Sequence, residues 1–215
     1  MKNSDKKIYI LSHKKIKSTE SLPMLDIKYL NQNIDLQSYD ALIFTSKNAI
    51  KALDTMNKNW KNIPSYAIAS QTAKVVKSLG GILTYIGKKN NGDEFANEIK
   101  EKLYGKKVLY VCGTKMVSKL VSILNQNGVS CYTLVIYQTI CKHYKRKIVL
   151  PKESIIVFSS PSTIDCFLKN VTWDNSFRAI SIGKTTSQYF PEYIIPTISD
   201  STSLEACVQK ALELD

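Results

Sequence analysis

The sequence contains little histidine and arginine, and these scarcities exclude several kinds of active site. Its two histidines, His13 and His143, are far apart, and no pair of carboxylates has a spacing typical of catalysis. A hydrolytic triad or a metal centre therefore has little support.

Nucleotide-binding motifs are missing as well. Neither a G-x-G-x-x-G dinucleotide fingerprint nor a G-x-S-x-G elbow occurs. The string Gly183-Lys184-Thr185-Thr186 resembles the end of a P-loop, but Arg178 stands where that motif needs its first glycine. If the chain is an enzyme, we expect it to work by orienting a reactive substrate.

The five cysteines are odd in number and far apart in the sequence, and none forms a C-x-x-C pair. They are Cys112, Cys131, Cys141, Cys166 and Cys207. This spacing predicts neither a disulfide framework nor a zinc site. Because buried cysteine usually behaves as a small hydrophobic residue, we do not expect a thiol nucleophile.

Long hydrophobic runs are also lacking. The run from Ile8 to Leu11 follows a basic N-terminus but is too brief for the apolar region of a secretory signal. No other stretch approaches the roughly 18–20 apolar residues of a membrane span. We expect a soluble cytoplasmic protein, and 215 residues with 44% hydrophobic content suffice for one large domain or two small ones.

Positive charge is abundant, and the formal net charge of +12 predicts attraction to an anionic partner. Composition alone does not choose between nucleic acid, a membrane surface and a small polyanion. Only Arg146 and Arg178 are arginine, which weakens a base-reading role. The densest basic segment, Lys142 to Lys147, is more often a solvated loop than a binding patch, but a polyanion or nucleic-acid binding module stays open as an alternative.

Short apolar runs alternate with helical patterns, which favours βαβ units and an α/β fold with a mainly parallel sheet. We predict strands at residues 8–11, 41–45, 66–69, 107–112, 130–137, 154–159 and 178–182. We predict helices at residues 47–56, 70–79, 94–103, 114–125, 162–168, 184–190 and 203–214.

An internal repeat is the most informative feature of the sequence. The string IFTSKNAI at Ile43–Ile50 matches VFSSPSTI at Val157–Ile164, at an offset of 114 positions. Two further pairs follow in the same order at nearly the same offset: 69–73 with 182–186, and 95–99 with 204–208. Two copies of one unit, each of about a hundred residues, predict two domains.

Each copy carries small hydroxyl side chains where a predicted strand ends and a helix begins. They are Thr45, Ser46, Ser70, Thr72, Ser159, Ser160, Ser162, Thr185 and Thr186. In a parallel α/β sheet these turns lie at the carboxyl edge, where ligands bind and helix N-termini offer N–H donors to anions. Ordinary N-capping would explain any single turn, but four turns mirrored across two copies favour an anion-binding site.

Six strings of the sequence occur in the order and spacing of one known family. They are YDALIFTSKNAI at 39–50, AIASQTAKVVKSLGG at 67–81, KKVLYVCGTKMVSKLVSIL at 106–124, VIYQT at 135–139, IVFSSPSTIDCF at 156–167 and AISIGKTTS at 179–187. Each string is weak alone, but together they resemble the uroporphyrinogen-III synthases. The chain departs from the family pattern at Ser12-His13, Ser70 and Cys112, where members usually have Thr-Arg, glycine and arginine.

The resemblance implies two similar flavodoxin-like parallel-sheet domains, the second inserted into the first. Domain 1 would comprise residues 1–30 with 140–215 and domain 2 residues 35–134, joined by linker strands near 27–32 and 134–139. The implied substrate is hydroxymethylbilane, a linear tetrapyrrole with eight carboxylates. The implied product is uroporphyrinogen III, formed with loss of water and inversion of the last pyrrole ring. The resemblance also implies a monomer that needs no metal or organic cofactor and binds neither nucleic acid nor a membrane.

The resemblance also adds site residues. It places Gly113, Gly183 and Lys184 with the hydroxyl residues as substrate-binding groups, and it makes Tyr137, from the VIYQT string, the candidate catalytic residue. Because a phenol is protonated at neutral pH, we expect Tyr137 to assist the departing hydroxyl as a hydrogen-bond or proton donor. The alternative is that Tyr137 ends a linker strand and packs against a domain. A ligand sensor of the same fold, without turnover, also stays open.

Overall fold

The computed structural model describes residues 6–214, and the chain divides into two compact units. Unit 1 combines the chain up to Asp26 with the chain from Ile140 onward, and unit 2 comprises Ile27–Thr139. The two boundaries fall within the strands β3 (Leu25–Tyr29) and β8 (Ser130–Cys141). Within residues 6–214, no helix is both long and apolar enough to cross a membrane.

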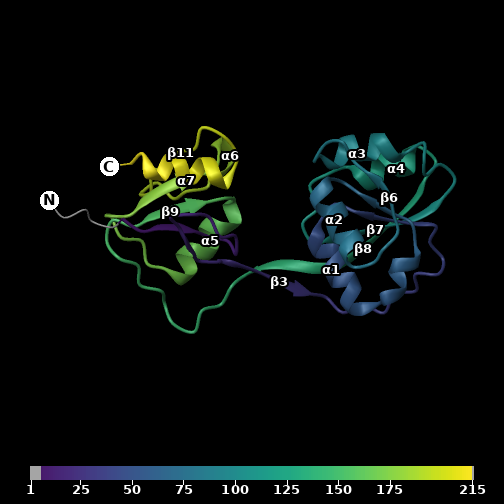
Figure 1. The fold of residues 1–215 in the computed structure, drawn as a ribbon, viewed down its shortest axis with the longest axis horizontal. Helices are drawn as coiled ribbons and strands as arrows, with labels where there is room; N and C mark the ends of the chain where they lie inside the picture. The colour runs from purple at the N-terminus through teal and green to yellow at the C-terminus, as the bar shows by residue number, and fades with distance from the viewer. Residues whose placement is uncertain (1–5, 215) are drawn as a thin grey trace. The chain divides into compact units, whose positions relative to one another are not determined.

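Unit 2 is built around a six-stranded sheet with the order β3-β8-β7-β4-β5-β6 (Figure 1). Its other strands are β4 (Ala41–Phe44), β5 (Ser65–Ala67), β6 (Leu83–Ile86) and β7 (Lys107–Gly113). Strand β4 pairs in parallel with β5 and with β7. The outer pairs, β5 with β6 and β7 with β8, are also parallel. The helices are α1 (Lys47–Met56), η1 (Lys58–Asn62), α2 (Ser70–Ser78), α3 (Gly92–Ile99) and α4 (Leu120–Gln126).

Helices cover both faces of this sheet because its central strands are apolar on both sides. All four residues of β4 are buried, and successive side chains point to opposite faces. Helices α1 and α2 pack with Trp60 against Leu42 and Phe44, whereas α3 and α4 pack against Ile43 and Tyr110. The faces of the central strands are therefore covered, and a ligand can approach these strands at their ends.

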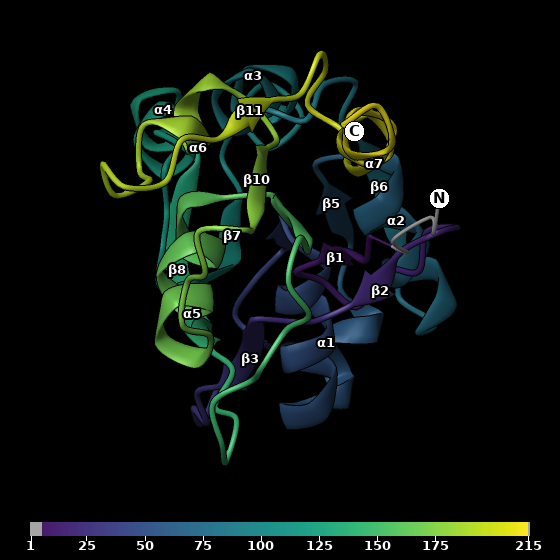
Figure 2. The same cartoon turned by 90° about the vertical axis from the view of Figure 1, so that its left-hand side faces the viewer.

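Unit 1 contains a five-stranded sheet with the order β11-β10-β9-β1-β2. Its strands are β1 (Ile8–Ile10), β2 (Glu20–Ser21), β9 (Ile155–Phe158), β10 (Arg178–Ser181) and β11 (Thr197–Ile198), and all neighbours are parallel. Its helices are α5 (Pro161–Asn170), α6 (Lys184–Ser187) and α7 (Leu204–Leu212). Helices α5 and α7 belong to separate core clusters on opposite faces of the sheet (Figure 2).

The repeated strings occupy corresponding positions in the two units. The first pair spans the turns from β4 to α1 and from β9 to α5, the second opens α2 and α6, and the third lies in α3 and α7. The spatial orders also correspond, because β6-β5-β4-β7-β8 in unit 2 matches β11-β10-β9-β1-β2 in unit 1. The difference is one of chain order: the last two strands follow β4 in unit 2 but precede β9 in unit 1.

Several predicted elements are corrected. The helix predicted at 114–125 begins only at Leu120, because the Lys119 N–H donates to Asp93 Oδ1 at 2.6 Å and holds the preceding segment as a loop. The strand predicted at 130–137 and the linker predicted at 134–139 form one continuous strand, β8. The helix predicted at 184–190 ends at Ser187. Strand β6 was not predicted; it is an edge strand whose residues alternate between part-buried and exposed.

The cysteine prediction was also wrong. Cys141 and Cys166 form a disulfide with a Cα–Cα distance of 5.1 Å. The two residues are 25 positions apart in the sequence, so spacing gave no signal, but the end of β8 packs beside α5 in the folded chain. Cys112, Cys131 and Cys207 are free and buried.

Candidate functional site

The carboxyl ends of β4 and β7 form the first candidate site. These strands are neighbours, yet β4 leads to β5 on one side of the sheet and β7 leads to β8 on the other. Such a topological switch point is where open α/β sheets bind ligands. Thr45 follows β4 and Gly113 ends β7, so two residues predicted from sequence lie together at this edge.

The Tyr110 hydroxyl forms a hydrogen bond with the Thr45 side chain. The phenol oxygen lies 2.9 Å from Thr45 Oγ1, and the Tyr110 side chain is only 5% exposed. Burial raises the pKa of the Tyr110 phenol, while its hydrogen bond to Thr45 opposes this increase. The phenol is therefore protonated at neutral pH and fixes the orientation of the Thr45 hydroxyl. Tyr110 was not predicted from the sequence. It lies two residues before Cys112 in a predicted strand, and the alternation of side chains along a strand places it on the same face of the sheet as Thr45.

Tyr137 lies directly against Gly113. A Cβ atom added to Gly113 would be 2.6 Å from Tyr137 Cζ and 3.0 Å from its hydroxyl oxygen. The register of β7 with β8 shifts here, because Cys112 pairs with Val135 but Gly113 pairs with Tyr137. Bulges of this kind redirect a side chain and are frequent beside active sites. The required role of Gly113 is thus steric: it leaves room for the Tyr137 ring.

Three more predicted residues of unit 2 follow β4 and β5. Ser46 caps α1, and its hydroxyl accepts a hydrogen bond from the Asn48 N–H at 3.1 Å. Ser70 is exposed at the first residue of α2, whose N-cap residue provides no side-chain hydrogen bond. Thr72 is only 6% exposed. The Ser70 hydroxyl is therefore available to a ligand. The Ser46 hydroxyl already caps α1, and the Thr72 side chain is buried.

In unit 1, the switch point lies between β1 and β9, and the predicted hydroxyl residues follow β9. Ser159, Ser160 and Ser162 are part-buried around the start of α5. The Ser160 N–H donates to Thr163 Oγ1 at 3.2 Å, so this helix start is already partly capped. Ser12, which follows β1 beside this turn, was noted only as a departure from the family pattern, and its hydroxyl accepts from the Lys14 N–H at 3.2 Å.

The segment from Gly183 to Thr186 follows the neighbouring strand β10. Lys184 and Thr185 are exposed and can contact a ligand. Thr186 is only 5% exposed, so its side chain packs within unit 1, and its contact with a ligand stays a prediction. Gly183 has an extended backbone with φ 177°, which any residue can adopt.

No thiolate or metal chemistry is apparent in the described part of the chain. Burial raises the pKa of Cys112 to about 11, so this thiol beside Gly113 is protonated at neutral pH. Among residues 6–214, no three metal-ligating side chains gather into one group.

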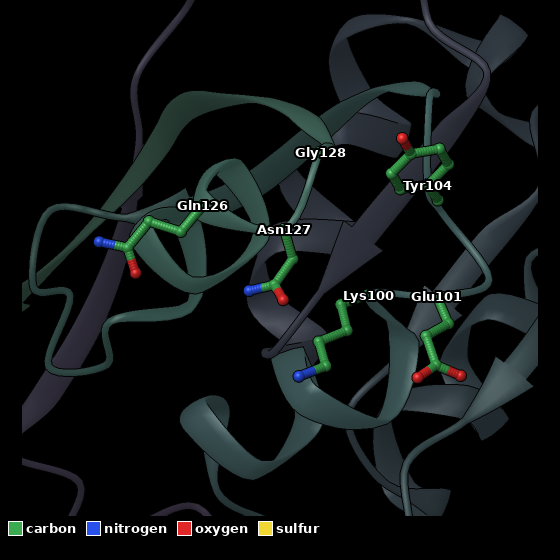
Figure 3. A pocket seen from close by; sticks show the side chains of 6 residues that line it. All are labelled: Lys100, Glu101, Tyr104, Gln126, Asn127 and Gly128. Carbon is green, nitrogen blue, oxygen red and sulfur yellow. The ribbon is translucent and has the colours of Figure 1, made fainter.

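A pocket of about 770 Å³ does not coincide with these residues. Lys100, Glu101, Tyr104 and Gln126 to Gly128 line it (Figure 3). They lie at or just after the ends of α3 and α4, next to the starts of β7 and β8, and so at the opposite edge from Thr45 and Gly113. A much smaller cavity, of about 40 Å³, adjoins Gly113 and Tyr137.

Comparisons with known proteins agree with this architecture. The chain matches the family described as uroporphyrinogen-III synthase HemD over residues 18–209. The crystal structure of uroporphyrinogen-III synthetase from Helicobacter pylori is 30% identical and has a TM-score of 0.78, and the match covers 98% of this chain and 100% of that chain. A mutant uroporphyrinogen III synthase from Thermus thermophilus has a TM-score of 0.50, 9% identity and 97% coverage of both chains, a likeness of fold alone.

The porphyrin biosynthesis protein HemD of Ruminiclostridium josui is 24% identical over 197 residues. The match covers 84% of this chain, which spans 39% of the length of that relative. The parallel sheets and the polar groups at their carboxyl edges define an α/β protein of the kind that binds small ligands there. The chain belongs to the uroporphyrinogen-III synthase HemD family.

Proposed function

We propose that this chain is a lyase that cyclises hydroxymethylbilane to uroporphyrinogen III in haem biosynthesis, with loss of water and inversion of the last pyrrole ring. One observation carries the proposal: the family match extends over residues 18–209 and therefore includes the turns after β4, β5, β7, β9 and β10. The placement of Thr45, Gly113 and Tyr137 at a switch point supports it.

The proposed reaction depends more on how the substrate is positioned than on a strong acid or base. The electron-rich pyrrole expels the terminal hydroxyl, and the azafulvene that results is attacked by the substituted carbon of the last ring. The spiro intermediate then fragments and recloses with that ring inverted. Holding the two ends of the substrate in this arrangement can supply roughly 7–11 kcal/mol.

Tyr137 has the assisting role in this proposal. Its phenol donates a proton to the departing hydroxyl, which leaves as water, and regains one when the newly joined ring carbon loses its hydrogen. Gly113 leaves room for the ring, and Tyr110 contacts Thr45 at the end of the neighbouring strand β4. The exposed hydroxyls of Ser70 and Thr185 and the charge of Lys184 are available for the substrate carboxylates.

The remaining predicted residues have supporting roles. Ser46 and Ser160 hold the helix starts whose N–H groups can meet a carboxylate, and Ser159 and Ser162 flank the second of these turns. Thr72, Thr186 and Gly183 shape the turns of α2 and α6. We also propose that the units are copies of one flavodoxin-like domain, with unit 2 inserted into unit 1. The order β2-β1-β9-β10-β11 supports this for unit 1.

A product assay tests the function directly. Purified protein is given hydroxymethylbilane, and the uroporphyrinogen isomers are separated after oxidation to the porphyrins. We expect the type III isomer in excess over the symmetric isomer that spontaneous closure gives. A Tyr137→Phe variant should slow formation of the type III isomer by roughly 10²-fold and raise the symmetric share. Only symmetric product with the folded wild-type protein would refute the proposal.

A further inference from the structure

The small cavity beside Tyr137 contains a basic group that the proposed function does not use. Gly113, Thr114, Lys115, Tyr137 and Thr139 line its volume of about 40 Å³. No carboxylate lines the cavity, and within residues 6–214 no Asp or Glu forms an ion pair with Lys115. The Lys115 ammonium is therefore free to pair with an anion from outside the chain.

The walls of the cavity are held in place by the fold. The Thr114 N–H donates to the Tyr137 carbonyl oxygen at 3.0 Å, which ties the start of the loop to β8. The Tyr137 ring is kept in position by the register shift and by its contact with Gly113. At the other end of the loop, the bond from the Lys119 N–H to Asp93 fixes the chain before α4. Lys115 thus extends from a short loop anchored at both ends.

The size and chemistry of the cavity fit one carboxylate. Its volume of about 40 Å³ is enough for at least one small polar group. The lining residues carry an ammonium, a phenol and two threonine hydroxyls, all of which can donate a hydrogen bond to a carboxylate oxygen. A charge-assisted pair of this kind is stronger than a neutral hydrogen bond.

We propose that Lys115, with Thr114, Thr139 and Tyr137, forms a subsite that binds one carboxylate of the tetrapyrrole substrate. This inference rests on the proposed function. The pyrrole that bears the hydroxymethyl group carries a carboxylate side chain on the adjacent ring carbon. Binding of that carboxylate at Lys115 brings the departing hydroxyl to Tyr137, so Lys115 sets which end of the bilane reaches the phenol.

Lys119 provides a matched control in the same loop. Lys115→Gln and Lys119→Gln each remove one exposed positive charge, so both weaken long-range steering of an anionic substrate equally. Only Lys115→Gln removes a donor from the cavity. We expect the KM for hydroxymethylbilane to rise about tenfold or more in Lys115→Gln and to stay within about twofold in Lys119→Gln. The Lys115→Arg variant keeps the charge and should recover most of the affinity.

A binding measurement separates this proposal from the proposed function. Uroporphyrin III, a stable octacarboxylate, can be titrated by fluorescence against each variant, without any turnover. Weaker binding to Lys115→Gln than to Lys119→Gln, retained at raised salt, supports the subsite even if the wild-type protein makes no type III isomer. Equal affinities and equal KM values of the two folded variants would overturn the subsite and leave the proposed function intact.

Discussion

Reduction of the Cys141–Cys166 disulfide should destabilise unit 1. The bond joins the end of β8 to α5 and closes a loop with a sequence separation of 25. In the chain-entropy treatment, a loop of this length restricts the unfolded chain enough to contribute about 3.5 kcal/mol at 25 °C. The Asn170 amide also ties α5 to the Lys142 carbonyl oxygen at 3.0 Å, so the folded arrangement itself should survive reduction.

The two tryptophans allow each unit to be followed separately by fluorescence. Trp173 lies in unit 1 against Phe177, and Trp60 lies in the core of unit 2. A Trp60→Phe variant therefore reports on unit 1 alone, and a Trp173→Phe variant on unit 2 alone. With an m-value of about 2 kcal/mol/M, reduction should lower the urea midpoint of the Trp173 signal by roughly 1.5–2 M.

Two results would refute this reasoning. Alkylation of the unfolded, unreduced protein should modify three cysteines and leave two protected, so modification of all five would show that the bond does not form. An unchanged Trp173 midpoint after reduction would show that the bond forms but does not restrain the unfolded chain. The Trp60 midpoint, and any midpoint in a Cys141→Ser variant, should not respond to the reductant.

Three further substitutions test the site. Gly113→Ala places a methyl group against the Tyr137 ring, so it should lower the free energy of unfolding in urea by about 1–3 kcal/mol. It should also lower the fraction of type III isomer in the product. An unchanged fraction would show that the contact has no role in catalysis. Tyr110→Phe frees the Thr45 hydroxyl and should raise KM more than it lowers the unfolding midpoint; loss of stability alone would mark Tyr110 as structural. Thr186→Phe should destabilise unit 1 by about 1–3 kcal/mol in the Trp173 signal, because the residue is buried, and a stable but inactive variant would contradict this.

The fold was largely readable from local patterns because both units repeat strand and helix at short range. The helix predicted at 47–56 is α1 as observed, and the paired strings lie in corresponding elements of the two units. Periodicity failed where structure depends on contacts between distant residues. The loop before α4 is set by Asp93, 26 positions before Lys119, and no local pattern predicts that bond.

The sheet edge at which the candidate residues lie could be predicted from the sequence, but the exposure and contacts of their side chains could not. Hydroxyl residues after strands predict a carboxyl edge, and Thr45 lies at one. Their exposure could not be predicted, because whether Thr72 or Thr186 faces solvent depends on how the helix packs on its sheet. The contact of Tyr137 with Gly113 depends on a register shift between β7 and β8, and the sequence of neither strand predicts that shift.

The correspondence between the units separates binding from chemistry. In the repeat, Ile43 of β4 corresponds to Val157 of β9; Ile43 pairs with Tyr110, and Val157 pairs with Ile10. The hydroxyl that supports Thr45 in unit 2 therefore has an apolar counterpart in unit 1, where Ile10 is fully buried. The hydroxyl-bearing turns occur in both units and suit the repeated carboxylates of the proposed substrate. Tyr110, Gly113 and Tyr137 gather at the switch point of unit 2, so we expect substitutions there to change the isomer ratio and those at the unit 1 turns to change mainly KM.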